Sequence, residues 1–374
     1  MVSFTTPRVA VLHQANDSPV VDEFLKPENV WGYKDSSADI AAALRARGVN
    51  VVTFASTVVD SSDDGWSFGD TYSEISRALD KGANLIWANA TLHTKHAVAV
   101  LPAGVSFVGH DPLAYEFMEN KLWVGTKLRQ LGLKIPTAYH AREINGRLEY
   151  VSSCDMATTA IWPLGYPAVA KPVRGRGSWG VKVLHSAKET SDFLSQAVSI
   201  PSRRGISMAR IAVGYMIEEY MPGIEITISV MPPSVKRPLT VTQDPRVHVS
   251  HSGYWCLPPL VRNCHIEGVL PYSRDVPAVF NTGTIVEVDA GVRKCMERCV
   301  HTAEFFKFRS LVRFDCRQDI CGDFRVLDLN MKPNLAGPGR VGRDKAGGLV
   351  FLGATAIGWD FGDLVLSLLE TAHR

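Results

Sequence analysis

The sequence has few of the features that mark membrane proteins or nucleic-acid-binding proteins. It carries 40 basic and 38 acidic side chains, a formal net charge of +2, which gives no electrostatic reason to expect nucleic acid or an anionic membrane as a partner. No apolar run approaches the ~18 residues that a membrane span requires. Residues 1–8 are too few and too polar for a signal peptide, so we expect a cytoplasmic protein.

Cysteine is scattered and lacks the paired C-x-x-C spacing of zinc motifs. The odd total of seven also argues against a disulfide framework and fits a reducing cytoplasm. Cys295 and Cys299 stand one helical turn apart. That spacing suits two half-buried core side chains or a pair of metal ligands.

The length and composition are those of a globular protein with several domains. Hydrophobic residues make up 46% of the chain and charged residues 21%, as in ordinary globular proteins. A chain of 374 residues exceeds one compact core, so we expect three units, at 1–115, 116–210 and 211–374.

Strands and helices alternate in the first unit, which predicts a parallel, Rossmann-like sheet covered by helices. We expect a helix that Ser36 or Ser37 caps and Gly48 ends. A second helix is expected near 72–79. The expected strands are 9–12, 51–54, 84–88 and 105–108.

The rest of the chain mixes strands and helices in a less regular order, so the predicted class is α/β with α+β character. Strands at 168–171 and 181–184 flank a glycine-rich loop. Pro201 to Gly205 has the composition of a linker. We expect further helices at 120–131, 188–197, 289–306 and 361–372.

Two strands near the C-terminus carry the pattern that best predicts chemistry. Leu311–Cys316 and Phe324–Asn330 flank a turn-rich segment, and alternate side chains of a strand share a face. Arg313 therefore points the same way as Asp315, and Asp328 the same way as Asn330. Oxygen ligands of this kind suit Mg²⁺, and the arginine would face developing negative charge. The same pattern also fits a hairpin whose charged face is merely solvated.

A glycine-rich loop at Gly175–Gly180 matches G-x-G-x-x-G. A strand follows it, which disfavours a dinucleotide fingerprint, and no Gly-Lys-Ser/Thr follows, which excludes a Walker A loop. Lys171 ends the preceding strand, where its ammonium can reach phosphate oxygens, while glycine N–H groups and Ser178 close over them. An ordinary glycine hairpin fits as well.

Residues Tyr215 to Glu225 form the third element. Glu218 and Glu225 stand on either side of a Pro222-Gly223 turn, where backbone groups can meet an adenine edge and a carboxylate can accept from ribose hydroxyls. Alone, this segment is also compatible with a simple hairpin.

Together these elements resemble the ATP-grasp superfamily, and within it most closely the D-alanine–D-alanine ligases. The resemblance extends from about Asp111 to the C-terminus and, more weakly, over the first unit. It implies an N-terminal Rossmann-like pre-ATP-grasp domain, a central lid subdomain and a C-terminal subdomain that binds metal and ATP. The motifs that carry it, in the family's order, are Met118-Glu-Asn-Lys121, Lys171-Pro172 before the glycine loop, Glu218 to Glu225, and Arg313-x-Asp315 before Asp328-x-Asn330.

The resemblance also implies residue roles. Arg313 and Ser178 are the catalytic candidates, with Arg313 stabilising the oxyanion of a tetrahedral intermediate. The implied ATP contacts are Lys121 and Lys171 at the phosphates, Gly177, Ser178 and Gly180 in the lid, Glu218, Glu219 and Met221 at adenine, and Glu225 at ribose. The implied ligands of two Mg²⁺ ions, which Mn²⁺ can replace, are Asp315, Asp328 and Asn330.

Departures from the family affect the substrate site. Asp328 stands where glutamate is usual, and Val11 to Asp17 replaces the element that grips the first amino acid's ammonium. After Asn330 the chain has its own insertion, so D-alanyl-D-alanine synthesis is not expected. The candidates for binding another substrate carboxylate are Asn334, Arg340 and Arg343, although a solvated basic loop also fits, and Arg246 is the candidate for a further phosphate-binding cation.

The expected function is an ATP-dependent carboxylate–amine ligase that forms an acyl phosphate and releases ADP and phosphate. It would join an amino acid or small carboxylic acid to an amine in peptide or secondary-metabolite synthesis. A carboxylase, a carboxylate kinase and a non-catalytic ATP-binding regulator remain alternatives, and Arg313 argues against the regulator. The expected partners are small molecules, and the family's habit suggests a homodimer.

Overall fold

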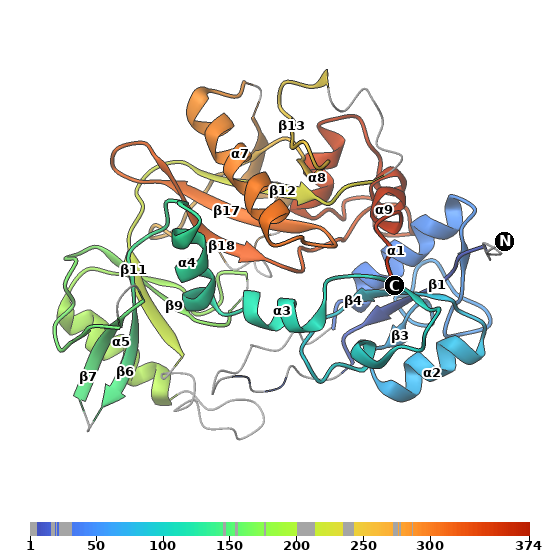
Figure 1. Ribbon diagram of the computed structural model, residues 1–374, viewed down its shortest axis with the longest axis horizontal. Coiled ribbons are helices and arrows are strands. Elements are labelled where there is room, and N and C mark those ends of the chain that lie inside the picture. Colours follow the sequence, from blue (N-terminus) through green and yellow to red (C-terminus); the bar gives the residue numbers. More distant parts are fainter. Residues whose placement is uncertain are drawn as a thin grey trace.

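In the part of the chain that the structure describes, three β-sheets follow one another, with helices between and over them (Figure 1). The computed structural model describes residues 6–15, 19, 21, 32–144, 147–153, 156–175, 177–199, 214–234, 243–271, 276, 278–285 and 287–374. The expected linker at 201–205 lies outside these ranges. Within them, no helix combines the length and the apolarity that crossing a bilayer demands.

The first sheet is parallel and has the strand order β2-β1-β4-β5, with β3 also paired to β1. Its central strands are largely buried because helices cover them, as the near-continuous apolar runs predict. Its elements are β1 (Arg8–His13), α1 (Lys34–Ala46), β2 (Asn50–Val51), β3 (Phe68–Gly69), α2 (Tyr72–Asp80), β4 (Leu85–Asn89), η1 (Ala97–Val100) and β5 (Ser106–Val108).

The second sheet is antiparallel and has the order β10-β9-β11-β6-β7-β8. Asn120 caps the preceding helix α4 by accepting a hydrogen bond from the Trp123 N–H at 3.2 Å. The elements of this region are α3 (Pro112–Met118), α4 (Lys121–Gln130), β6 (Ala138–Ile144), β7 (Arg147–Ser152), β8 (Thr158–Thr159), β9 (Ala168–Pro172), β10 (Lys182–Leu184), α5 (Ala187–Ser199) and β11 (Tyr215–Glu219).

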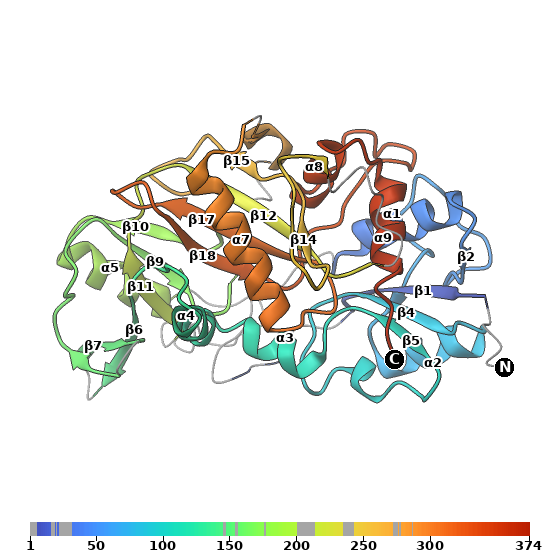
Figure 2. The same cartoon turned by 45° about the horizontal axis from the view of Figure 1, so that its top comes forward.

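The third sheet carries the C-terminal hairpin, and α7 lies across it (Figure 2). Its path is β13-β14-β12-β15-β16, with β17 paired to both β12 and β18. The elements are β12 (Glu225–Met231), β13 (His248–Val249), β14 (Trp255–Cys256), β15 (Leu260–Arg262), η3 (Ala278–Asn281), β16 (Thr282–Thr284), α7 (Ala290–Phe305), β17 (Val312–Gln318), β18 (Phe324–Asn330), α8 (Leu349–Thr355) and α9 (Phe361–Leu369).

The end of the chain returns to the first unit. Helix α9 shares an apolar cluster with α1, and the Arg47 side chain forms ion pairs with Asp360 and Asp363. His373 forms an isolated bridge with Phe107 beside the first sheet (Figure 1). These contacts join the first and third units although they lie at opposite ends of the sequence.

The structure corrects several sequence-based expectations. Helix α1 begins at Lys34 rather than after Ser36 or Ser37, because the Ser37 hydroxyl donates to the Leu12 carbonyl at the end of β1 (3.0 Å) instead of capping the helix. The expected strand at 51–54 ends at Val51, and the Lys81 ammonium binds two later carbonyls of that segment, those of Thr53 and Phe54.

The change from the second sheet to the third falls after residue 210, where the sequence analysis expected a unit boundary. Strand β11 pairs with β6 and β9, so the second sheet extends to Glu219. Strand β12 begins at Glu225 in the third sheet. The chain therefore passes from one sheet to the next through the Pro222-Gly223 segment.

Candidate active site

The C-terminal hairpin has the predicted geometry. Asp315 lies directly opposite Asp328, and Arg313 lies directly opposite Asn330, in the antiparallel pairing of β17 with β18. The Arg313 guanidinium binds Asp315 through two hydrogen bonds, of 2.9 Å from Nε and 2.7 Å from Nη2. The register then shifts between Asp315 and Cys316, where β18 has the extra residue Leu327. The hairpin thus gathers two carboxylates, an amide and a guanidinium, as alternation predicted.

Asp315 is the most heavily hydrogen-bonded member of this group. Besides Arg313, it accepts hydrogen bonds from the Thr227 hydroxyl (2.7 Å) and the Asn330 amide (2.9 Å). Burial alone would raise the pKa of Asp315, but Arg313 and Thr227 outweigh it, so the pKa lies below its usual value. Asp315 is therefore ionised at neutral pH.

Two lysines from the second unit face this hairpin. The Lys121 ammonium lies 3.2 Å from an Asp328 oxygen and donates to the Gly175 carbonyl at 3.0 Å. The Lys171 ammonium lies 2.7 Å from Glu218 and donates to the Leu327 carbonyl at 2.9 Å. The expected phosphate-binding lysines and the expected metal ligands thus meet in one place.

Glu218 is almost completely buried beside Lys171, with 4% of its surface exposed. Burial raises its pKa, and Lys171 opposes that effect. A carboxylate in such a site depends on its lysine partner, because an unpaired buried charge is strongly unfavourable.

Two adjoining cavities open around these residues. The first is mostly apolar and is lined by α4, by Lys171 and Glu218 of the second sheet, and by the Val326–Leu329 segment of β18. The second is mostly polar and includes Lys121, Gly175 and Asn330. Both include Asp328. The charged groups therefore lie at the junction of an apolar and a polar compartment.

The glycine-rich loop connects two paired strands, β9 and β10, which is the strand–loop–strand form expected. Gly177, Ser178 and Gly180 all have left-handed backbones, with φ of 60°, 65° and 69°. A Cβ on Gly180 would lie 2.7 Å from the Tyr215 hydroxyl, so only glycine fits there. Ser178 adopts the same region at a cost, since it has a side chain.

The expected adenine segment is not a hairpin, because Glu218 and Glu225 lie in different sheets. Glu219 is held at the Thr137 backbone, where its carboxylate accepts the N–H (2.7 Å) and its own N–H donates to the carbonyl (3.1 Å). Glu225 lies 2.8 Å from His265 Nε2. Met221 is buried between these positions.

The residues expected to bind a substrate carboxylate have other partners. The Arg340 guanidinium is buried and binds Asp39 (2.8 Å) and Asp63 (2.6 Å) of the first unit. Arg343 also binds Asp39, at 2.6 Å. These arginines join the insertion to the first unit, so the alternative of a merely solvated basic loop does not hold, while a role at the substrate stays a prediction. The Asn334 side chain caps its own turn by accepting from the Ala336 N–H.

Arg246 does not extend toward the hairpin. Its guanidinium binds Asp244 and the carbonyl of Ala356 at the end of α8. The nearby aspartate explains this placement, because a bidentate Arg–Asp pair two residues apart satisfies most of the guanidinium donors locally.

Lys332 is a site residue that the sequence analysis missed. Its ammonium is buried and lies 3.1 Å from the centre of the Tyr33 ring, a cation–π contact between the third and first units. Both residues line the polar cavity with Lys121 and Asn330. Alternation beyond the strand end, from Asp328 through Asn330 to Lys332, was the available signal.

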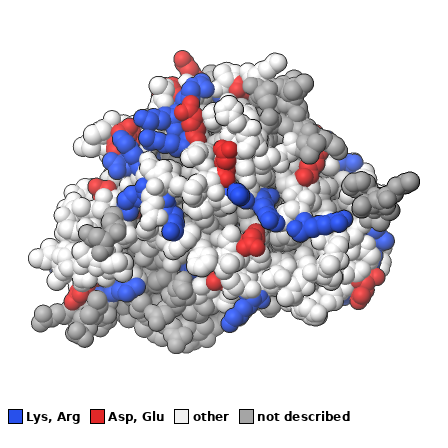
Figure 3. All heavy atoms as spheres, viewed as in Figure 1, with Lys and Arg blue, Asp and Glu red and all other residues white. Residues whose placement is uncertain are grey.

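Charges of both signs are interspersed on the face of the molecule in Figure 3. The groups that gather at the hairpin are instead largely enclosed, with side-chain exposures of 16% for Arg313 and 17% for Asp315. Their mutual interactions are therefore screened less by salt than those of surface pairs.

Solved structures resemble this arrangement over nearly the whole chain. The D-alanine–D-alanine ligase from Bacillus anthracis complexed with ATP has a TM-score of 0.61 at 15% identity and covers 98% of this chain and 97% of that one. The VanG D-Ala:D-Ser ligase from Enterococcus faecalis has a TM-score of 0.55 at 13% identity, with 98% and 99% covered. The chain has an ATP-grasp fold.

A solved structure of a protein with a different activity also aligns with the chain. A biotin carboxylase–β,γ-ATP complex from Campylobacter jejuni aligns with this ATP-grasp chain at a TM-score of 0.59 and 12% identity, covering 98% of this chain and 72% of that one. No protein-family model and no curated protein sequence matches the chain. The fold is thus established by structural comparison, at sequence identities where comparison of sequences alone finds no match.

Proposed function

We propose that the chain is an ATP-dependent carboxylate–amine ligase that releases ADP and phosphate. One observation carries the proposal: Lys121 contacts Asp328, and Lys171 contacts the Leu327 carbonyl, on the strand that sets Asp328 opposite Asp315. Cations that face paired carboxylates across a cleft suit a polyphosphate with its metal ions. Ion pairs that only stabilise a protein surface would not require cations from two elements of one unit to meet the same strand of another.

The donor set fits magnesium. Asp315 and Asp328 lie directly opposite each other, and Asn330 adds an amide oxygen on the same face, which is the hard-oxygen chemistry that Mg²⁺ prefers. Arg313 and Lys121 now balance these carboxylates. Bound magnesium would neutralise phosphate charge and polarise the phosphorus under attack.

The chain's own residues would bind and orient ATP. Lys121 starts α4, so its ammonium and the positive end of that helix lie on the same side of the cleft. Lys171 faces the same cleft, and the loop with Gly177, Ser178 and Gly180 would cover the phosphates. The backbone N–H and C=O groups of Tyr220 and Met221, between the two sheets, would bind the edge of adenine.

The proposed chemistry has two steps. A substrate carboxylate oxygen attacks the γ-phosphorus, which forms an acyl phosphate and releases ADP. The amine then attacks the acyl carbon, and phosphate leaves with the original carboxylate oxygen. Arg313 would stabilise the oxyanion between these events, and to do so its guanidinium must turn from Asp315 toward the acyl group.

Lys332 supports an anionic substrate. It adds a second ammonium to the polar cavity beside Lys121, with Tyr33 as its neighbour. We assign it to the carboxylate of the acid substrate or the acyl phosphate formed from it. Lys332 lies after Asn330, in the segment where the sequence departs from the D-alanine–D-alanine ligases. A cation at this position suits an amino acid or small acid used in peptide or secondary-metabolite synthesis.

Carboxylation or carboxylate phosphorylation without an amine is the second candidate, favoured by the likeness to biotin carboxylase. A test incubates the chain with ATP, Mg²⁺ and pooled acids, with and without pooled amines. The ligase predicts ADP, phosphate and a new amide product only when amines are present. Turnover that bicarbonate stimulates without amine would favour a carboxylase, and ATP binding without stimulated turnover would favour a regulator.

A further inference from the structure

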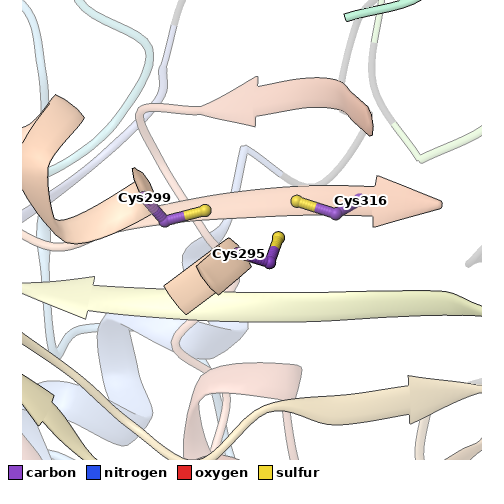
Figure 4. Close-up of side chains that lie close together, drawn as sticks. All are labelled: Cys295, Cys299 and Cys316. Carbon is purple, nitrogen blue, oxygen red and sulfur yellow. The ribbon is translucent and has the colours of Figure 1, made fainter. Parts of the chain in front are cut away.

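Three cysteines converge behind the metal hairpin. Cys295 and Cys299 lie one turn apart on α7, and Cys316 reaches them from β17. Their sulfur atoms all lie within 4.8 Å of one another. Figure 4 shows the three side chains pointing toward a common centre. The sequence placed only the first two together.

The surroundings of this cluster are dry. Cys299 and Cys316 are completely buried, and Cys295 is 5% exposed. All three belong to the large apolar core that α7 forms with the third sheet. Mg²⁺ and Ca²⁺ require oxygen ligands and keep water, so a site of this kind discriminates against them and accepts soft ions.

We propose that Cys295, Cys299 and Cys316 form a trigonal binding site for one Cu(I) ion. Three converging sulfurs in a buried apolar core meet the preference of a soft d¹⁰ ion for thiolate ligands. The site is separate from the ATP cleft and does not depend on the ligase reaction.

Coordination number favours Cu(I) over Zn²⁺. Zinc sites in proteins are almost always four-coordinate, whereas the described residues bring three sulfur ligands together here. The apolar core around them disfavours water as a fourth ligand. Metal binding would release the thiol protons to solvent, because the thiolate is the form that binds metal.

The ion would connect the core to the active site. Cys316 directly follows Asp315 on β17, where the register with β18 shifts, and the two side chains lie on opposite faces of the strand. Coordination would join α7 to β17 at this point. We therefore expect Cu(I) to raise the melting temperature of the chain.

The test is an anaerobic titration of the fully reduced chain with Cu(I) held by bicinchoninate as competitor. The expected result is one tightly bound ion per chain with three sulfur neighbours in X-ray absorption. Cys299→Ala should lose the ion, whereas the double variant Cys264→Ser with Cys321→Ser, which changes two exposed cysteines, should keep it.

A second variant guards against misfolding. Cys316→Ala removes a ligand from the strand rather than the helix, and each variant's circular dichroism is compared with the wild type. Retained Cu(I) in folded Cys299→Ala and Cys316→Ala, or loss of the ion in the exposed-cysteine variant, would overturn the site. Tighter binding of Zn²⁺ than Cu(I) would overturn the monovalent assignment.

Discussion

Asp315→Asn tests the electrostatic centre of the site. The side chain accepts two hydrogen bonds from Arg313 and one each from Thr227 and Asn330. Asparagine keeps the shape but turns one acceptor into a donor, which leaves the guanidinium without its carboxylate. Breaking a buried pair in this way destabilises the fold by roughly 3–5 kcal/mol, and because both groups are partly exposed we expect the lower end of this range, about 3 kcal/mol.

Such a loss lowers the melting temperature of a 150–250-residue unit by roughly 6–12 °C, which differential scanning calorimetry measures directly. The matched control is Asp323→Asn, on the same hairpin, whose partner Lys134 is exposed. Exposed pairs contribute less than about 1 kcal/mol. A melting temperature equal to that of the control would refute the reasoning.

The same variant tests the metal assignment. Mg²⁺ with ADP should stabilise the wild type and the Asp323→Asn control, because a ligand of the native state adds its binding free energy to stability. The Asp315→Asn variant should show little further stabilisation by Mg²⁺ and no turnover. Equal stabilisation of all three proteins would remove Asp315 from the metal site.

Three further predictions follow from individual side chains. Burial lowers the pKa of His110 to about 4, so the unfolded chain binds a proton at this side chain more readily than the folded chain. The free energy of unfolding should therefore fall by up to about 3 kcal/mol as the pH is lowered from 6.5 to 4. Urea titrations should show a weaker pH dependence for a His110→Gln variant. Arg340→Met should lower stability by about 3 kcal/mol and Arg343→Met by less, because only the first guanidinium is fully enclosed; equal melting temperatures would contradict this. Lys332→Met should raise the KM of the acid substrate about tenfold or more and leave the KM of ATP unchanged. The control variant Lys345→Met should change neither KM, and steady-state kinetics measure both.

Local periodicity was enough to predict the hairpin. Alternation placed Asp315 with Arg313 and Asp328 with Asn330, and the observed register brings the two strands into the expected pairing. The helix that begins at Lys121 was also predictable, because Asn120 is a strong N-cap and Gly132 follows its end. The order of such elements identified the fold that the solved structures confirm.

Contacts between distant segments were not predictable. Arg340 was expected at a substrate, but its partner Asp39 belongs to the first unit, and no local pattern encodes that pair. Cys316 likewise joins Cys295 and Cys299 only through the packing of α7 on β17. Side chains that two units share depend on tertiary geometry, which a single sequence does not display.

The adenine segment shows the same limit at shorter range. A Pro-Gly turn between two strand-like runs predicts a hairpin, but β11 and β12 each pair with other strands, which separates Glu218 from Glu225. Each of these strands could pair with several others, and tertiary packing determines which pairs form. Strand propensity alone does not predict which of these pairings is the most stable.

The transfer of oxygen from acid to phosphate tests the proposed function most directly. The chain is incubated with ATP, Mg²⁺, pooled amines and pooled amino and carboxylic acids whose carboxylates carry ¹⁸O, and the released phosphate is analysed by mass spectrometry. An acyl phosphate predicts phosphate that contains one ¹⁸O atom, released together with ADP. Unlabelled phosphate, or AMP with pyrophosphate, would contradict the ligase mechanism.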